Sequence, residues 1–96
     1  MAAYVIGRMK IQTREWMDEY FSKVPAVIES YGGRFLVRGG NPQTLEGHDA
    51  IPDAAFIVEF PSRDLALAFW RSEEFAPLVQ LRQTGSELEA IVVDGI

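Results

Sequence analysis

The sequence predicts a single α+β domain, and three observations lead to this expectation. The chain has 96 residues, which is within the usual size of one domain. Short β-branched runs alternate with longer segments whose apolar residues recur at helical spacing. The hydrophobic fraction is 48%, enough for a core, and no linker, repeat or low-complexity segment divides the chain. We therefore expect one domain over residues 1–96.

The chain is expected to begin with a strand and a long helix. Residues 3–11 are rich in β-branched side chains and alternate loosely, which favours a strand. Thr13 is a suitable N-cap for the helix that follows. The helical spacing of its apolar residues continues past Pro25, so we expect a kink there and no end. Gly32 and Gly33 supply the left-handed position that ends the helix.

The rest of the chain continues this alternation. Glycine or proline follows most of the further apolar runs, and a serine stands before each of two later helical segments, where it can cap the first turn. A long polar loop separates the second strand from the third. We expect strands at residues 34–38, 54–60 and 88–93, a helix after Ser62, and a short helix from Pro77 to about Arg82.

The resulting order, β-α-β-β-α-β, predicts a ferredoxin-like four-stranded antiparallel sheet with the two main helices on one face. Alternation assigns the side chains to the two faces, and a slip of one residue would exchange them. The face toward the helices is expected to hold Val5, Met9, Phe35, Val37, Phe56, Val58, Phe60, Ala90 and Val92. The other face is expected to hold Tyr4, Ile6, Arg8, Arg34, Leu36, Arg38, Ala55, Ile57, Glu59, Glu89, Ile91 and Val93.

The centre of this second face is apolar, with Ile6, Leu36, Ile57 and Ile91 contributing one residue per strand. A contiguous apolar patch of this kind is normally covered by a partner. A second copy of the same sheet, related by a two-fold axis, is the simplest cover. The sequence therefore predicts a homodimer with a small-molecule space at its rim.

Composition excludes several classes of function. The chain carries 14 acidic and 9 basic residues, a formal net charge of −5, so nucleic acid is not an expected partner. It has no cysteine, which excludes disulfides, thiolate metal sites and a cysteine nucleophile. No apolar run approaches the roughly 18 residues that cross a bilayer, and the N-terminal residues do not resemble a secretory signal. We expect a cytoplasmic protein with no membrane partner and no cofactor.

Arg38 and Glu59 are the leading candidates for a site. Arg38 is the last residue of a predicted strand and is followed by Gly39 and Gly40. It could hold the carboxylate of a ligand, which the two glycines would allow to approach the backbone. Alternatively, it could form an ion pair with Glu59 on the adjacent strand. Glu59 lies in a strongly apolar strand, where it is either paired or a general base with a raised pKa. Arg8 is the expected third member of this cluster.

Other candidates have plain structural alternatives. His48, the only histidine, could act in acid–base chemistry or simply be exposed in its loop. We expect no metal there, and a haem would need a well-buried histidine. Ser72 fits a helix cap better than a nucleophile. Arg82 could oppose the dipole at a helix C-terminus.

Four motifs spread over nearly the whole chain resemble one family. They are YGGRFLVRGG at residues 31–40, LEG at residues 45–47, EFPS at residues 59–62 and SEEF…R at residues 72–82. This series resembles the DUF1330 family of small bacterial proteins, a domain of unknown function. The resemblance implies the fold of the dimeric α+β barrel superfamily, in which two ferredoxin-like sheets face each other. That superfamily includes cofactor-free monooxygenases, lactone isomerases and haem proteins, so it selects no reaction.

The positions that match the family's motifs are Arg38, Gly39, Gly40, Glu46, Gly47, Glu59, Ser72 and Arg82. The chain departs from the pattern at Phe75, where relatives usually carry tyrosine. Two functional hypotheses follow. In the first, a dimer binds a small acidic or aromatic metabolite beside the sheet through Arg8 and Arg38, and Glu59 or His48 moves a proton if a reaction occurs. In the second, the protein is a structural or interaction module, and its Arg/Glu cluster is only a buried ion-pair network.

Overall fold

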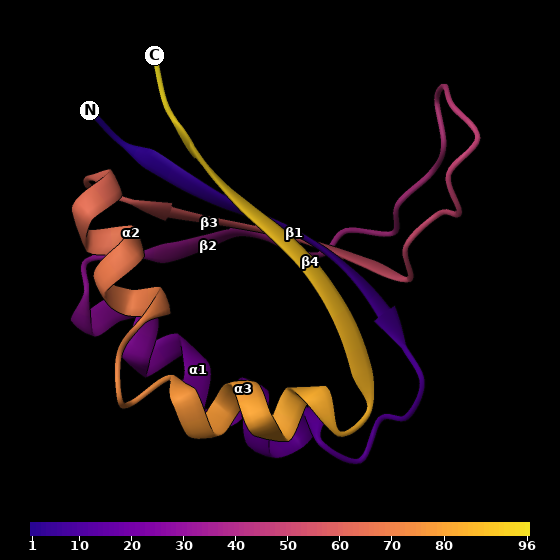
Figure 1. The fold of residues 1–96 in the computed structure, drawn as a ribbon, viewed down its shortest axis with the longest axis horizontal. Helices are drawn as coiled ribbons and strands as arrows, with labels where there is room; N and C mark the ends of the chain where they lie inside the picture. Colours follow the sequence, from indigo (N-terminus) through magenta and orange to yellow (C-terminus); the bar gives the residue numbers. More distant parts are fainter.

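The computed structural model describes residues 1–96, and its elements follow the expected order (Figure 1). The strands are β1 (Ala3–Ile11), β2 (Arg34–Gly39), β3 (Ala54–Phe60) and β4 (Ser86–Asp94), and the helices are α1 (Met17–Ser30), α2 (Arg63–Trp70) and α3 (Ala76–Gln83). The strands form one antiparallel sheet in the order β2-β3-β1-β4. The ferredoxin-like arrangement is therefore confirmed. None of the three helices is both long and apolar enough to cross a membrane.

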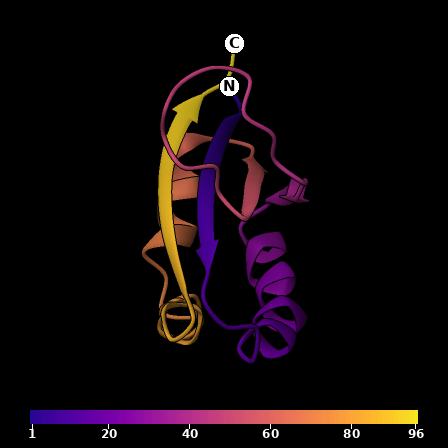
Figure 2. The same ribbon diagram turned by 90° about the vertical axis from the view of Figure 1, so that its right-hand side faces the viewer.

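The helices form one layer on a single side of the sheet, and the core lies between the two layers (Figure 1). Val5 and Met9 of β1 are buried in this core, which also contains Val24 and Ile28 of α1. Burying a side chain of this size contributes about 1.5–3 kcal/mol to folding. The two chain termini lie together at one end of the sheet (Figure 2). The loop of residues 40–53 projects from the other end (Figure 1).

Helix α1 begins later than the sequence indicates. Thr13 is not its N-cap, because Trp16 occupies that position without a side-chain cap hydrogen bond. Instead, the Trp16 Nε1 donates to the Thr13 carbonyl at 2.7 Å, which holds the preceding turn. The helix then continues through Pro25 as expected. Gly32 follows it with φ of +80°, the left-handed conformation that glycine adopts without strain.

Strand β2 contains an irregularity that alternation could not predict. Phe35 pairs with Val58, but Val37 pairs with Ile57, the next residue along β3. Leu36 is therefore an extra residue, and Leu36 and Val37 together oppose Ile57. This is a β-bulge, which shifts the side-chain alternation by one position beyond it.

The bulge corrects two of the predicted face assignments. Val37 lies on the face away from the helices, because it shares that face with its partner Ile57. Arg38 is paired with Phe56 and lies on the helix-facing side, not on the open face. The open face nevertheless remains apolar at its centre, since Leu36 is 46% exposed and Ile91 is 61% exposed.

Candidate functional site

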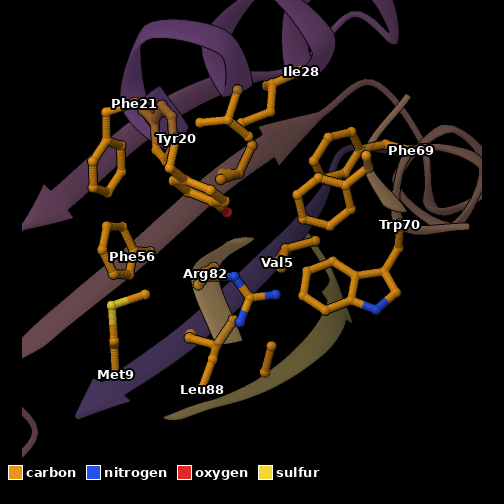
Figure 3. A pocket seen from close by; sticks show the side chains of 16 residues that line it. Val5, Met9, Tyr20, Phe21, Ile28, Phe56, Phe69, Trp70, Arg82 and Leu88 are labelled. Atoms are coloured by element: carbon orange, nitrogen blue, oxygen red, sulfur yellow. The ribbon is translucent and has the colours of Figure 1, made fainter. Parts of the chain in front are cut away.

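A cavity of about 50 Å³ lies inside the domain, between the sheet and the helices (Figure 3). At ~10–15 Å³ for each water, this volume holds only a few water molecules. Sixteen residues line it and 14 of them are hydrophobic. The two exceptions are Gly7 on β1 and Arg82 on α3. A single charged side chain therefore faces an otherwise apolar space.

Arg82 is almost completely buried, with 3% of its surface exposed. Its Nε has no hydrogen-bond partner, and none of the three ion pairs of the chain includes it. The guanidinium carbon lies 6.0 Å from the centre of the Tyr20 ring. Figure 3 shows the guanidinium among Tyr20, Val5 and Leu88. Burying a charge without a partner of opposite charge is costly. The Arg82 guanidinium is buried in this way, so an anion bound beside it would be stabilising.

The position of Arg82 follows from the stripe of α3 that faces the core. Leu78 and Arg82 are the two buried residues of this helix and stand four residues apart, so they share one face. Such a position ordinarily holds an apolar side chain. The sequence signal for a buried cation was therefore an arginine placed one helical turn after Leu78, on the apolar face of α3. Arg82 also lies in the last turn of α3, where it can oppose the helix dipole as predicted.

Tyr20 of α1 is the second polar group at the cavity, and sequence analysis missed it. Tyr20 is one of the apolar residues that recur at helical spacing in this segment, a pattern typical of core positions, and it is buried. Burial raises the pKa of the Tyr20 hydroxyl, and the nearby positive charge of Arg82 only partly offsets this. The hydroxyl therefore keeps its proton near neutral pH and can donate a hydrogen bond.

The raised pKa of Tyr20 predicts a loss of stability at alkaline pH. Unfolded Tyr20 ionises near pH 10.0 and the folded residue at a higher pH. Its contribution to stability is therefore present below pH ~10 and is lost as pH rises through the folded pKa. Urea denaturation between about pH 8 and pH 11 is expected to show a fall that is weaker in Tyr20→Phe. An equally steep fall in the variant would contradict this assignment.

The cavity reaches the surface at the edge strand β4. Ala90 pairs with Gly7 and so lies on the helix-facing side of the sheet, yet Ala90 is exposed. The helices thus leave this part of the sheet uncovered. Trp70, at the end of α2, borders the same opening and is 39% exposed. Its ring contacts Phe75 at a centroid distance of 5.3 Å.

Ser72 and Phe75 shape the wall of the cavity. The Ser72 hydroxyl donates to the Phe69 carbonyl at 2.8 Å and accepts from the Phe75 amide at 3.2 Å. Ser72 therefore holds the turn that precedes α3, but it is not the predicted helix cap, because Phe75 is the N-cap residue of that helix. Phe75 is buried, and its ring lies 4.3 Å from that of Phe69. Because position 75 is phenylalanine and not tyrosine, it brings no hydroxyl to the cavity, which Tyr20 and Arg82 supply with polar groups.

Of the two alternatives for Arg38, the ion pair with Glu59 is wrong. The bulge in β2 turns Arg38 to the helix side of the sheet. There its guanidinium carbon lies 5.5 Å from the centre of the Phe21 ring and 5.8 Å from that of Phe35. Arg38 belongs to none of the ion pairs and stays exposed.

We expect Arg38→Ala to lower the free energy of unfolding by only about 0.5–1 kcal/mol, the range of an exposed cation–π contact. Urea denaturation checks this value. A loss of ~3–5 kcal/mol, as for an orphaned buried ion pair, would mean that Arg38 has a buried anionic partner after all.

Glu59 has different partners on the open face. It accepts from the Arg34 Nε at 3.0 Å and from the Tyr4 hydroxyl at 3.1 Å. The Arg34 side chain is 71% exposed and that of Glu59 is 26% exposed, so this pair is not a buried network. Arg8 does not join them, because it pairs with Ala55, four residues along β1 from the partner of Glu59.

The loop candidates lie away from the cavity. His48 and Glu46 are exposed and, with Arg8, border an open hollow of about 600 Å³. Arg8 donates to the Ala50 carbonyl at 3.0 Å and so anchors this loop to β1. Gly39 and Gly40 have φ of +91° and +72° and start the loop.

Comparison with known proteins identifies the family. A family model described as a domain of unknown function, DUF1330, matches residues 2–96. The chain belongs to this family. Among curated proteins, none matches the sequence.

Three solved structures illustrate how this DUF1330 protein compares in fold. A protein of unknown function from Rhodopseudomonas palustris has 20% identity and a TM-score of 0.81, over 99% of this chain and 82% of that one. A dimeric ferredoxin-like protein of unknown function from Jannaschia has 8% identity and a TM-score of 0.72, over 99% and 100%. SnoaB, a cofactor-independent oxygenase from Streptomyces nogalater, has 13% identity and a TM-score of 0.65, over 99% and 93%.

Four of the DUF1330 motif positions fall into two groups in the structure. Arg82 lines the cavity, and Ser72 holds the turn beside it. Glu46 and Glu59 lie on the loop and the open face, outside the cavity. Only the first group is placed to act on a molecule bound inside the domain.

Proposed function

We propose that this DUF1330 protein binds a small acid with a flat apolar body in the cavity between sheet and helices. The observation that carries the proposal is the buried Arg82 guanidinium, whose Nε lacks a hydrogen-bond partner in an apolar space. A planar guanidinium binds a carboxylate through two parallel hydrogen bonds, which supplies both the missing charge and the missing acceptors. The Tyr20 hydroxyl would donate to the same anionic group.

The rest of the cavity favours an aromatic body. Phe21, Phe56, Phe69 and Phe75 supply aromatic surface to its wall, and rings of this kind pack well against a flat ligand. The present volume of about 50 Å³ is too small for a benzene ring without movement of the rim. Trp70 borders the opening and is partly exposed, so its side chain is the one best placed to shift.

The same groups would support cofactor-free chemistry on such a ligand. Arg82 would stabilise negative charge that develops on a ligand oxygen, and Tyr20 would hold or donate a proton there. Neither Glu59 nor His48 lines the cavity, so a proton-transfer role for either would need a ligand on the open face or in the loop hollow. The likeness to SnoaB is one of fold and leaves the reaction open.

We also propose that the open face is covered by a second copy of the chain. The exposed side chains of Leu36 and Ile91 belong to the apolar centre of that face, and monomers seldom leave such a patch in water. The similar Jannaschia protein is described as dimeric. A two-fold arrangement would bring the two patches together.

Isothermal titration with benzoate and with benzamide tests the ligand proposal. The two molecules have nearly the same shape, but only benzoate carries the charge that Arg82 lacks. A charge-assisted hydrogen bond is worth about 1.5–3 kcal/mol, so benzoate is expected to bind roughly 10- to 100-fold more tightly. Equal affinities, or no binding of benzoate at millimolar concentration, would contradict the proposal.

A further inference from the structure

A second hollow lies beside the opening of the cavity. Its volume is about 120 Å³, and all seven of its lining residues are hydrophobic. One side is formed by α2 through Ala66 and Leu67, and the other by the edge strand β4 through Ala90 and Val92, which lie on the helix-facing side of the sheet. No charged or polar side chain interrupts this surface. We call it the α2–β4 groove.

The α2–β4 groove and the interior cavity are adjacent and share part of their lining. Val5, Trp70 and Ala90 line both spaces. Ala90 carries only a methyl group and is exposed, so it leaves room between the two. Trp70 borders both and packs against Phe75 at 5.3 Å and Phe69 at 6.5 Å. A molecule anchored in the cavity would therefore meet the groove as soon as it extended past Trp70.

The apolar lining of the groove determines which part of a ligand can bind there. An acid at Arg82 has its charged end inside the domain, so the part that passes Trp70 is the opposite end of the molecule. In the groove this end contacts residues whose side chains are all hydrophobic. Burying apolar ligand surface there is favourable, whereas burying a polar group without a partner is costly.

We infer that the ligand is an amphiphilic acid, whose anionic head pairs with Arg82 and whose apolar tail lies in the α2–β4 groove. This inference rests on the proposed function and narrows its ligand class, from small apolar acids to acids with an alkyl or aryl extension. It assigns Leu67 as a residue that determines specificity for tail length. Leu67 lines the groove and does not line the cavity.

The test is a titration series of benzoate, 4-ethylbenzoate and 4-butylbenzoate. Each methylene buried in the groove is expected to tighten binding roughly two- to fourfold, from about 0.8 kcal/mol per buried methylene. In Leu67→Asp, benzoate should bind as in the wild type, while the gain with chain length disappears. Leu67→Ala adds no charge and should show a smaller increase in affinity with chain length than the wild type. This variant keeps the test informative if Leu67→Asp does not fold.

Leu65→Asp is the matched control on the same helix. Leu65 is 36% exposed and lines neither space, so this variant should keep the full gain. The inference is overturned if benzoate binds but the longer acids bind no more tightly, or if Leu67→Asp and Leu67→Ala keep the wild-type gain. Failure of benzoate itself to bind would instead overturn the proposed function, and the tail assignment with it.

Discussion

Arg82→Met is expected to weaken benzoate binding by roughly 30- to 5,000-fold while stabilising the ligand-free protein. Removing one partner of a desolvated charge pair costs about 2–5 kcal/mol of binding. Methionine fills a similar volume with a flexible apolar chain. Because it replaces a buried cation whose Nε has no partner, we expect the free energy of unfolding to rise by about 1–3 kcal/mol. Titration calorimetry and urea denaturation measure the two effects.

The opposite signs of these effects distinguish a binding residue from a structural one. Arg71→Met provides the control, because Arg71 follows α2 and is exposed. It should change neither binding nor stability appreciably. If Arg82→Met instead lost several kcal/mol of stability and bound benzoate normally, Arg82 would have a structural role and the ligand assignment would be wrong.

Ile91→Glu is expected to raise the dissociation constant of the dimer by at least about 100-fold. The two-fold axis would place two buried carboxylates in one interface, and a single unpaired buried charge already costs ~3–5 kcal/mol. Ile91 is 61% exposed within one chain, so the fold itself should tolerate the change. Sedimentation velocity across a concentration series measures the shift from dimer to monomer.

Leu65→Glu is the appropriate control for the dimer. Like Ile91, Leu65 is a partly exposed branched aliphatic residue. It lies on α2, in the helical layer and away from the open face of the sheet. This variant should sediment as the wild type does. A wild-type protein that is monomeric at micromolar concentration would contradict the dimer, and Ile91→Glu would then have no effect on sedimentation.

The fold could be predicted because its signals are local and agree with one another. The bounds of β1 and β3 follow directly from their β-branched runs and from the proline after β3. Helix α1 continues through Pro25 because its apolar stripe keeps packing on the sheet. Its start was misplaced, since Thr13 has the chemistry of a cap but the chain makes a turn before the helix.

The candidate site was harder to predict because it depends on contacts between distant residues. The bulge at Leu36 leaves no trace in the alternation of β2, yet it moves Arg38 from one face to the other. Glu59 was expected to need a partner and has one, but the partner is Arg34. Arg82 was singled out through a family resemblance and its helix position, and its burial beside Tyr20 emerges only when α1 and α3 pack together.

The central claim is that the cavity binds an acid with its carboxylate on Arg82. A crystal structure of the protein with 4-bromobenzoate tests it directly, because the anomalous signal of bromine fixes both the position and the direction of the ligand. The carboxylate is expected to contact the Arg82 guanidinium, with bromine on the side of the cavity toward Trp70 and Ala90. A bromine peak found only on the open face of the sheet or in the loop of residues 40–53, with the Arg82 guanidinium free of any anion, would contradict the claim.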